Sequence, residues 1–270
     1  MKQTADTAWK ISDLSTPFHE TYFCCLEDWS DDLKEAGNHK ACWFNQFKDK
    51  GLRIKIALNE RNDAVGMIQY LPIEQSFVQG QDLYFVLCIW VHGHKQGIGN
   101  YQGHGIGQAL LGAAEVDAKQ KGAKGMAAWG LWTPFWMKAS WFKKHGYQKA
   151  GREGWGLLVW KPYTNDAKPP TWIRPKKQPP MVAGKVTVAA FINGWCPAQN
   201  MVFERAKRAC TEFGDQVIFQ EYDTSNRDTL LEWGIVDAVY VNGKPVSYGP
   251  PPPYEKIKGI IQKAIKKSAH

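Results

Sequence analysis

A glycine-rich stretch, YQGHGIGQALL over residues 101–111, is the feature that most constrains how this chain can fold. It follows the apolar run LYFVLCIWV at 83–91. Its second half begins a segment, 107–121, whose alanines and leucines recur on one helical stripe. A glycine loop between a buried strand and a helix start directs several main-chain N–H groups at one point, where the helix dipole adds positive potential. The stretch predicts an anion site, with a tight turn that holds no ligand as the alternative.

The glycine spacing and the order of the elements narrow the kind of anion site. Side chains at Gly103, Gly105 and Gly107 would block the close approach that a pyrophosphate needs. A dinucleotide-binding fold places its glycines after the first strand of a parallel sheet, whereas this loop follows an antiparallel pair predicted at 53–60 and 64–73. No Gly-Lys-Ser/Thr follows the glycines, which excludes a P-loop.

The remaining periodicity of the first 163 residues predicts an α/β fold. Helical spacing occurs before the first predicted strand. The helix that begins at the glycine loop is followed by further strands and one more helix. The predicted helices are 19–36, 42–50 and 135–145, and the further strands are 124–132 and 156–163.

The glycine loop and its context resemble those of the GCN5-related N-acetyltransferases, the GNAT family. Gln102 to Gly107 matches the family's pyrophosphate loop, Gln/Arg-x-x-Gly-x-Gly/Ala, and FKKHGY at 142–147 resembles its terminal YEKLGF element. The resemblance covers roughly residues 50–163. It implies a mixed-sheet fold. In this fold strands 83–91 and 124–132 splay apart, admit the pantetheine arm of the cosubstrate acetyl-CoA, and bring the thioester to an acceptor amine.

The resemblance also implies which residues bind acetyl-CoA. The main chain of Gly103 to Gly107 would bind the pyrophosphate while Gln102 braces the loop, and the strand before it would pair its main chain with the pantetheine amides. The expected binding residues are Ile89, Trp90, Val91, Gln102, Gly103, His104, Gly105, Ile106, Gly107 and Gln108.

Acetyl transfer needs a base for the amine proton and an acid for the leaving thiolate. The tyrosine that serves the family as acid falls at Phe142, which carries no proton to donate. His92 and His94, in an extra segment between strand and loop, are the candidate bases, with a solvated loop as the alternative. They show no third ligand for a metal ion, so no metal site is predicted.

A cluster of aromatic residues marks the candidate acceptor site. Trp129, Trp132 and Trp136 are the expected substrate-binding residues, with Phe135 and Trp141 nearby. Their ring faces can hold an apolar or cationic small-molecule amine, and packing between strand and helix is the alternative.

A proline- and lysine-rich segment divides the chain, because it can neither form a regular helix nor bury a core. The expected division is a GNAT-like domain at 1–163, a linker at 164–184 and a second, smaller domain at 185–270. The order strand, helix, strand, helix, hairpin, helix, with Trp-Cys-Pro at 195–197, resembles the thioredoxin/glutaredoxin fold. The combination resembles the YoaP-like N-acetyltransferases, which implies that the second domain shapes the acceptor site.

Cys196 is predicted at a helix N-terminus, where the dipole and free amides stabilise a thiolate. Gln199 replaces the second cysteine of a CxxC motif, and Asp237 takes the position of the family's cis-proline. A nearby carboxylate would oppose the dipole. The second hypothesis for function is therefore a thiol-dependent redox or soft-metal stress module that uses Cys196, joined to a domain that binds CoA without catalysis.

Composition sets the remaining expectations. The charge of +8 is spread along the chain without a nucleic-acid motif, so no nucleic-acid partner is expected. No apolar segment approaches the roughly 20 residues of a membrane span, and the N-terminus lacks a secretory signal, so we expect a cytoplasmic protein without a membrane partner. Six irregularly spaced cysteines do not indicate a disulfide framework, and no feature indicates an oligomeric state.

Overall fold

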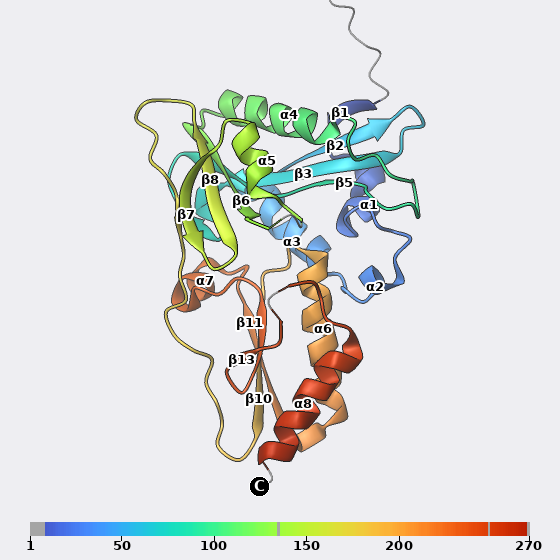
Figure 1. The fold of residues 1–270 in the computed structure, drawn as a ribbon, viewed down its shortest axis with the longest axis vertical. Coiled ribbons are helices and arrows are strands. Elements are labelled where there is room, and N and C mark those ends of the chain that lie inside the picture. Colours follow the sequence, from blue (N-terminus) through green and yellow to red (C-terminus); the bar gives the residue numbers. More distant parts are fainter. Residues whose placement is uncertain (1–8, 134–135, 248, 269–270) are drawn as a thin grey trace, which may run out of the picture. The chain divides into compact units, whose positions relative to one another are not determined.

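The computed structural model describes residues 9–133, 136–247 and 249–268, which divide into two compact units (Figure 1). The first unit contains the described residues up to Trp29 together with Phe47–Trp172. The second contains Ser30–Gln46 together with the described residues from Ile173 onward. The sequence does not predict that Ser30–Gln46 belongs with the C-terminal part of the chain.

The first unit is built on a mixed seven-stranded sheet of order β1-β2-β3-β5-β6-β8-β7. Neighbouring strands are antiparallel except β5 and β6, which are parallel. The strands are β1 (Trp9–Asp13), β2 (Arg53–Asn59), β3 (Ala64–Pro72), β5 (Leu83–Val91), β6 (Gly125–Leu131), β7 (Gln148–Glu153) and β8 (Gly156–Pro162). The predicted α/β class with a mixed sheet is confirmed.

Helices and short elements complete the first unit. The long helix α4 packs its apolar stripe, which includes Leu110 and Ala114, against Ile68 and Val86 of the sheet. The helices are α1 (His19–Phe23), α4 (Ile106–Gln120) and α5 (Ala139–Lys144), with single 3-10 turns at Thr16–Phe18, Lys48–Lys50 and Ile73–Gln75 and a two-stranded ribbon of β4 (Val78–Gln79) and β9 (Thr171–Trp172).

The two parallel strands of the sheet separate partway along their length. β5 pairs with β6 only from Leu83↔Gly125 to Val86↔Ala128, although β5 continues to Val91. Beyond this point Leu131 of β6 pairs instead with the segment that precedes α5, where its N–H donates to the carbonyl oxygen of Met137 at 2.7 Å. The splay expected between these strands is therefore present.

The second unit has a four-stranded sheet of order β11-β10-β12-β13, in which β10 is parallel to β11 and antiparallel to β12. Its core joins Val188 and Ala190 of β10 to Phe203 of α6 and Ile257 of α8. The elements are α2 (Asp31–Lys34), α3 (His39–Phe47), β10 (Val186–Ile192), α6 (Pro197–Glu212), a 3-10 turn (Gly214–Gln216), β11 (Val217–Asp223), α7 (Arg227–Trp233), β12 (Ala238–Val241), β13 (Lys244–Pro245) and α8 (Tyr254–Ser268).

Some elements differ from the sequence prediction. The helix predicted over 19–36 is interrupted after Phe23, because Cys25 and Leu26 adopt φ angles of 53° and 66°, outside the right-handed helical region. The helix predicted over 135–145 begins at Ala139, and Phe135 lies outside the described residues. In the part of the chain that is described, no helix is both long and apolar enough to cross a bilayer.

Candidate functional site

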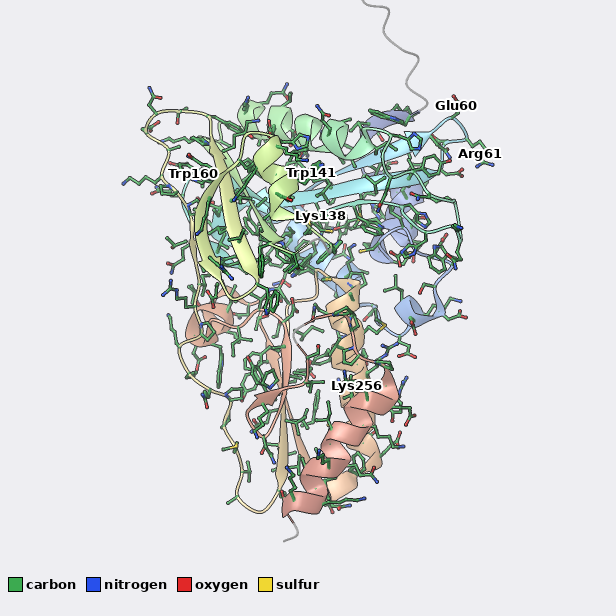
Figure 2. The ribbon with its side chains drawn as sticks, viewed as in Figure 1. Glu60, Arg61, Lys138, Trp141, Trp160 and Lys256 are labelled. Carbon is green, nitrogen blue, oxygen red and sulfur yellow. The ribbon has the colours of Figure 1, made fainter. Side chains whose placement is uncertain are left out.

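A pocket of about 660 Å³ opens in the first unit beside the splayed strands. Three segments line it: the end of β5, the glycine loop with the start of α4, and the chain entering and forming α5. Figure 2 labels Lys138 and Trp141 from the last of these. The lining residues are Ile89, Trp90, Val91, Tyr101, Gln102, Gly103, Gly105, Ile106, Gly107, Gln108, Trp136, Met137, Lys138, Trp141, Phe142 and His145.

The glycine loop is shaped to admit an anion at the helix start. Gly103 and Gly105 have φ angles of 86° and 81°, a conformation that L side chains rarely adopt, and Gly105 is the N-cap of α4. A Cβ atom at either position would have no other heavy atom within 4 Å. Because the first N–H groups of a helix have no intrahelical partner, the main chain offers donors toward this open space.

Gln102 anchors the loop to the end of β5. Its side-chain Nε2 donates to the carbonyl oxygen of Val91 at 3.0 Å, and its main-chain N donates to Asn100 Oδ1 at 2.9 Å. A Cβ atom on Gly93 would lie 2.3 Å from Gln102 Nε2, so only glycine leaves room for this bond. The bracing role expected for Gln102 thus has a specific hydrogen bond.

The opposite wall is held against β6. A Cβ atom on Gly130 would lie 2.5 Å from the carbonyl oxygen of Met137, so this glycine permits the close approach of the segment before α5. Trp129 Nε1 donates to the carbonyl oxygen of Leu87 at 2.8 Å, directly past the last paired residues of β5 and β6. Trp129 also meets Trp136 edge to face, with ring centroids 5.4 Å apart.

The structure places most, but not all, of the predicted binding residues at this pocket. Of the ten residues expected to bind acetyl-CoA, His104 alone is outside the lining; its side chain is exposed on the loop. Trp136 lines the pocket. Trp132 does not: its side chain is 54% exposed and stacks on Trp155 at a centroid distance of 5.7 Å.

Sequence reasoning missed the contribution of one helix face. Lys138, Trp141 and His145 line the pocket, and their spacing of three and four residues places them on one side of α5 and its flanks. His145 Nδ1 hydrogen-bonds to the carbonyl oxygen of Trp141 at 2.8 Å, with the two rings 4.2 Å apart. Phe142, on the same helix, is fully buried.

His92, one of the two predicted catalytic bases, is engaged by other groups of the protein. It is completely buried, its Nδ1 donates to the carbonyl oxygen of Gly99 at 2.6 Å, and its Nε2 accepts from Trp29 Nε1 at 3.0 Å. Both ring nitrogens are therefore engaged in hydrogen bonds within the protein. His94 differs: its side chain is 41% exposed, and its Nε2 lies 3.4 Å from Glu27 Oε1.

Cys196 lies at the N-cap of α6, as predicted, but it is only 7% exposed. Part of the cover comes from α3, since a Cβ atom on the nearby Gly194 would lie 3.2 Å from Trp43 Cβ. Asp237 accepts a hydrogen bond from the main-chain N of Asn193 at 2.8 Å, and burial raises the pKa of Asp237 to about 7. This burial restricts access of external thiols to Cys196.

Among the described residues, no group of three or more His, Cys, Asp and Glu side chains is arranged to hold a metal ion.

A comparison with models of known protein families finds a match for this part of the chain. Residues 12–134 match the model described as "Acetyltransferase (GNAT) family". This segment is therefore a GNAT acetyltransferase domain. A comparison with curated protein sequences finds no significant match.

Several solved structures are similar to this chain at low identity. The PaiA N-acetyltransferase from Thermoplasma acidophilum in complex with coenzyme A is 17% identical, with a TM-score of 0.44, over 57% of this chain and 99% of that one. A GNAT family acetyltransferase from Elizabethkingia anophelis with acetyl-CoA bound is 18% identical, with a TM-score of 0.39, over 57% and 98%. One from Brucella melitensis in complex with acetyl-CoA is 13% identical, with a TM-score of 0.41, over 62% and 96%.

Proposed function

We propose that the first unit is an acetyl-CoA-dependent N-acetyltransferase that transfers the acetyl group to an amine of a small molecule. One observation carries this proposal: the glycine loop at the start of α4 and the unpaired edge of β5 past Val86 border the same pocket. The match of residues 12–134 to the GNAT family supports it.

The residues present fit acetyl-CoA. Open space in front of Gly103 and Gly105 leaves room for a pyrophosphate at the helix N-terminus. Lys138 adds a cationic side chain to the lining, which suits a polyanionic cosubstrate. Past Val86, the edge of β5 that faces β6 has no strand partner among the described residues, so its main chain can pair with the amides of an extended arm.

The chemistry requires one proton to leave the amine and one to reach the thiolate. The amine nitrogen attacks the thioester carbonyl carbon, a main-chain N–H of β5 stabilises the developing oxyanion, and the C–S bond breaks. His94 accepts the amine proton, since His92 is engaged in structural hydrogen bonds. Because Phe142 has no proton to donate, the thiolate is protonated from solvent.

The acceptor would enter beside the tryptophans. Trp136 lines the pocket, so its ring offers an apolar wall for the amine, while Trp129 packs edge to face against Trp136 without lining the pocket itself. Trp132, stacked on the exposed Trp155, would contact only an acceptor that extends out of the pocket.

We further propose that the second unit is thioredoxin-like. Its order of elements, β10-α6-β11-α7-β12-β13-α8, with Cys196 at the start of α6, supports this assignment. Its role in shaping the acceptor site stays a prediction.

Calorimetric titration with acetyl-CoA tests the proposed function. We expect micromolar binding that Gly105→Glu abolishes, because a side chain there is strained and carries a negative charge into the anion site. Gly112→Glu is the matched control, since Gly112 is an exposed residue of α4 whose Cβ would meet no atom within 4 Å. Absence of binding by the unmodified protein, or equal binding by Gly105→Glu, would overturn the proposal. Release of CoA with a panel of amines then identifies acceptors.

A further inference from the structure

The loop that follows α1 is held in an unusual conformation. Cys25 and Leu26, two consecutive residues other than glycine, have φ angles of 53° and 66°. Each such residue costs on the order of 1–2 kcal/mol, so surrounding contacts must hold the loop in place. The Leu26 side chain provides one of these, since it is 2% exposed. Strained residues of this kind are concentrated at functional sites, so the side chains of this loop are candidates for a functional role.

The loop is fixed against the segment between β5 and the glycine loop. Trp29 Nε1 donates to His92 Nε2 at 3.0 Å. A Cβ atom on Gly97, whose φ is 63°, would lie 2.3 Å from Trp29 Cδ1, so the indole packs directly on this glycine. His92 is itself bonded to the carbonyl oxygen of Gly99. These contacts fix the position of the loop relative to the end of β5.

Glu27 lies in this loop, and its carboxylate faces His94. Its Oε1 lies 3.4 Å from His94 Nε2, and the exposed fractions of the two side chains are 21% for Glu27 and 41% for His94. The His94 ring stands against Trp29, with centroids 5.2 Å apart, and against Trp90, with centroids 6.0 Å apart. Trp90 lines the pocket, so His94 contacts a residue of the pocket wall, although neither His94 nor Glu27 is itself among the lining residues.

We propose that Glu27 is a positioning residue that holds His94 as the proton acceptor for an aliphatic ammonium substrate. This inference rests on the proposed acetyltransferase function. With Nε2–H directed at Glu27, the Nδ1 atom of His94 is the nitrogen left to accept a proton. The ammonium loses one proton to Nδ1, the freed nitrogen pair forms the bond to the thioester carbon, and the C–S bond pair leaves with the thiolate. The nitrogen releases its second proton to solvent as the amide forms, and the thiolate takes a proton from solvent. The carboxylate stabilises the imidazolium that results.

The electrostatic surroundings of Glu27 and His94 favour a positively charged acceptor. Burial raises the pKa of the Glu27 carboxyl above its ordinary value, while His94 and His92 act in the opposite direction. A half-buried carboxylate attracts an ammonium group, and the rings of Trp29 and Trp90 beside His94 can add cation–π attraction. An alcohol or an arylamine, which are neutral near pH 7, gains neither interaction.

Glu27→Gln tests the pair, with Glu20→Gln as the matched control because Glu20 is an exposed carboxylate of α1. The tautomer of His94 is followed through the ¹⁵N NMR signals of its ring nitrogens in the full chain. In the unmodified protein we expect the ring N–H on Nε2, facing Glu27, and in Glu27→Gln a mixture of the two tautomers, since the carboxylate that favours Nε2–H is lost. Glu20→Gln should leave the tautomer unchanged. An unchanged tautomer in Glu27→Gln would overturn the pairing, whether or not the protein turns over.

Kinetics supply the second readout. We expect Glu27→Gln to lower kcat/KM for an alkylamine about tenfold or more, with acetyl-CoA affinity unchanged. In a His94→Gln background the same substitution should cost less than about twofold, because the carboxylate then has no base to position. An equal loss in both backgrounds would assign Glu27 a merely structural role and refute the proposal. If the wild type binds no acetyl-CoA, the proposed function fails instead, a result distinct from any of these.

Discussion

The indole N–H of Trp129 donates to the carbonyl oxygen of Leu87 at 2.8 Å, and so bridges β6 to β5 directly after their ladder ends at Val86↔Ala128. A parallel ladder that stops early leaves main-chain donors and acceptors of β5 without a strand partner. The bridge satisfies one of them and fixes the width of the opening. The remaining edge of β5, at Ile89 to Val91, lines the pocket.

Trp129→Phe should therefore weaken both stability and acetyl-CoA binding. Phenylalanine keeps ring contacts with Phe77 and Trp136 but cannot donate to Leu87. Loss of this bond should lower the free energy of unfolding by about 1 kcal/mol and weaken binding several-fold, because the strand separation is less well defined. Thermal denaturation and calorimetry measure the two effects. Trp155→Phe, at an exposed ring, is the control, and equal results for both variants would contradict the role of the bridge.

Gln102→Met should weaken acetyl-CoA binding without unfolding the protein. Methionine matches the length of glutamine but cannot donate to the carbonyl oxygen of Val91, so the glycine loop loses its tie to β5. The expected loss is about 1 kcal/mol, or roughly fivefold in Kd. Calorimetry on this variant is compared with Gln120→Met at the exposed far end of α4. Unchanged affinity in Gln102→Met would show that the loop needs no such tie.

His92→Phe should destabilise the first unit. It would leave the partly buried N–H of Trp29 and carbonyl oxygen of Gly99 without their partner, and each unsatisfied group costs about 1–3 kcal/mol. We expect a decrease of roughly 2–4 kcal/mol in the free energy of unfolding. His104→Phe, at an exposed loop position, should stay within about 0.5 kcal/mol of the wild type. Chemical denaturation measures the free energy of unfolding of both variants. Similar values for the two would restore His92 as a candidate base.

The sequence predicted those parts of the fold whose signal is local. The strands at β2, β3 and β5 and the turn at Gly103 to Gly107 depend on alternation, apolar runs and glycine, all readable within a few residues. β7, with the sequence QKAGRE, has no apolar alternation and forms a strand only because β8 pairs with it. The membership of Ser30–Gln46 in the second unit is likewise invisible to local patterns.

The candidate site shows the same limit. His92 is a plausible base in sequence, and its structural role depends on Trp29, which lies 63 residues earlier in the chain. Glu27 carries no motif, and its position follows from two left-handed residues that no sequence pattern marks. Lys138, Trp141 and His145 could have been found, because their spacing places them on one helix face. Of this helix, only Phe142 and Trp141 enter the sequence interpretation, where Trp141 is not combined with Lys138 and His145.

Asp237 makes the stability of the second unit depend on pH. Burial raises its pKa to about 7 in the folded chain, compared with about 3.9 for an unfolded aspartate. Between these values the folded state binds the proton that the unfolded state releases, so this contribution to stability is complete below about pH 4 and is lost as the pH rises to about 7. Asp237→Asn is neutral at every pH and keeps an oxygen that accepts from the main-chain N of Asn193. We therefore expect the melting temperature of Asp237→Asn relative to wild type to increase between pH 5 and pH 7.5. Asp215→Asn, at an exposed position, should show no such trend, and parallel curves for Asp237→Asn and the wild type would show that this carboxyl is ionised in the folded protein.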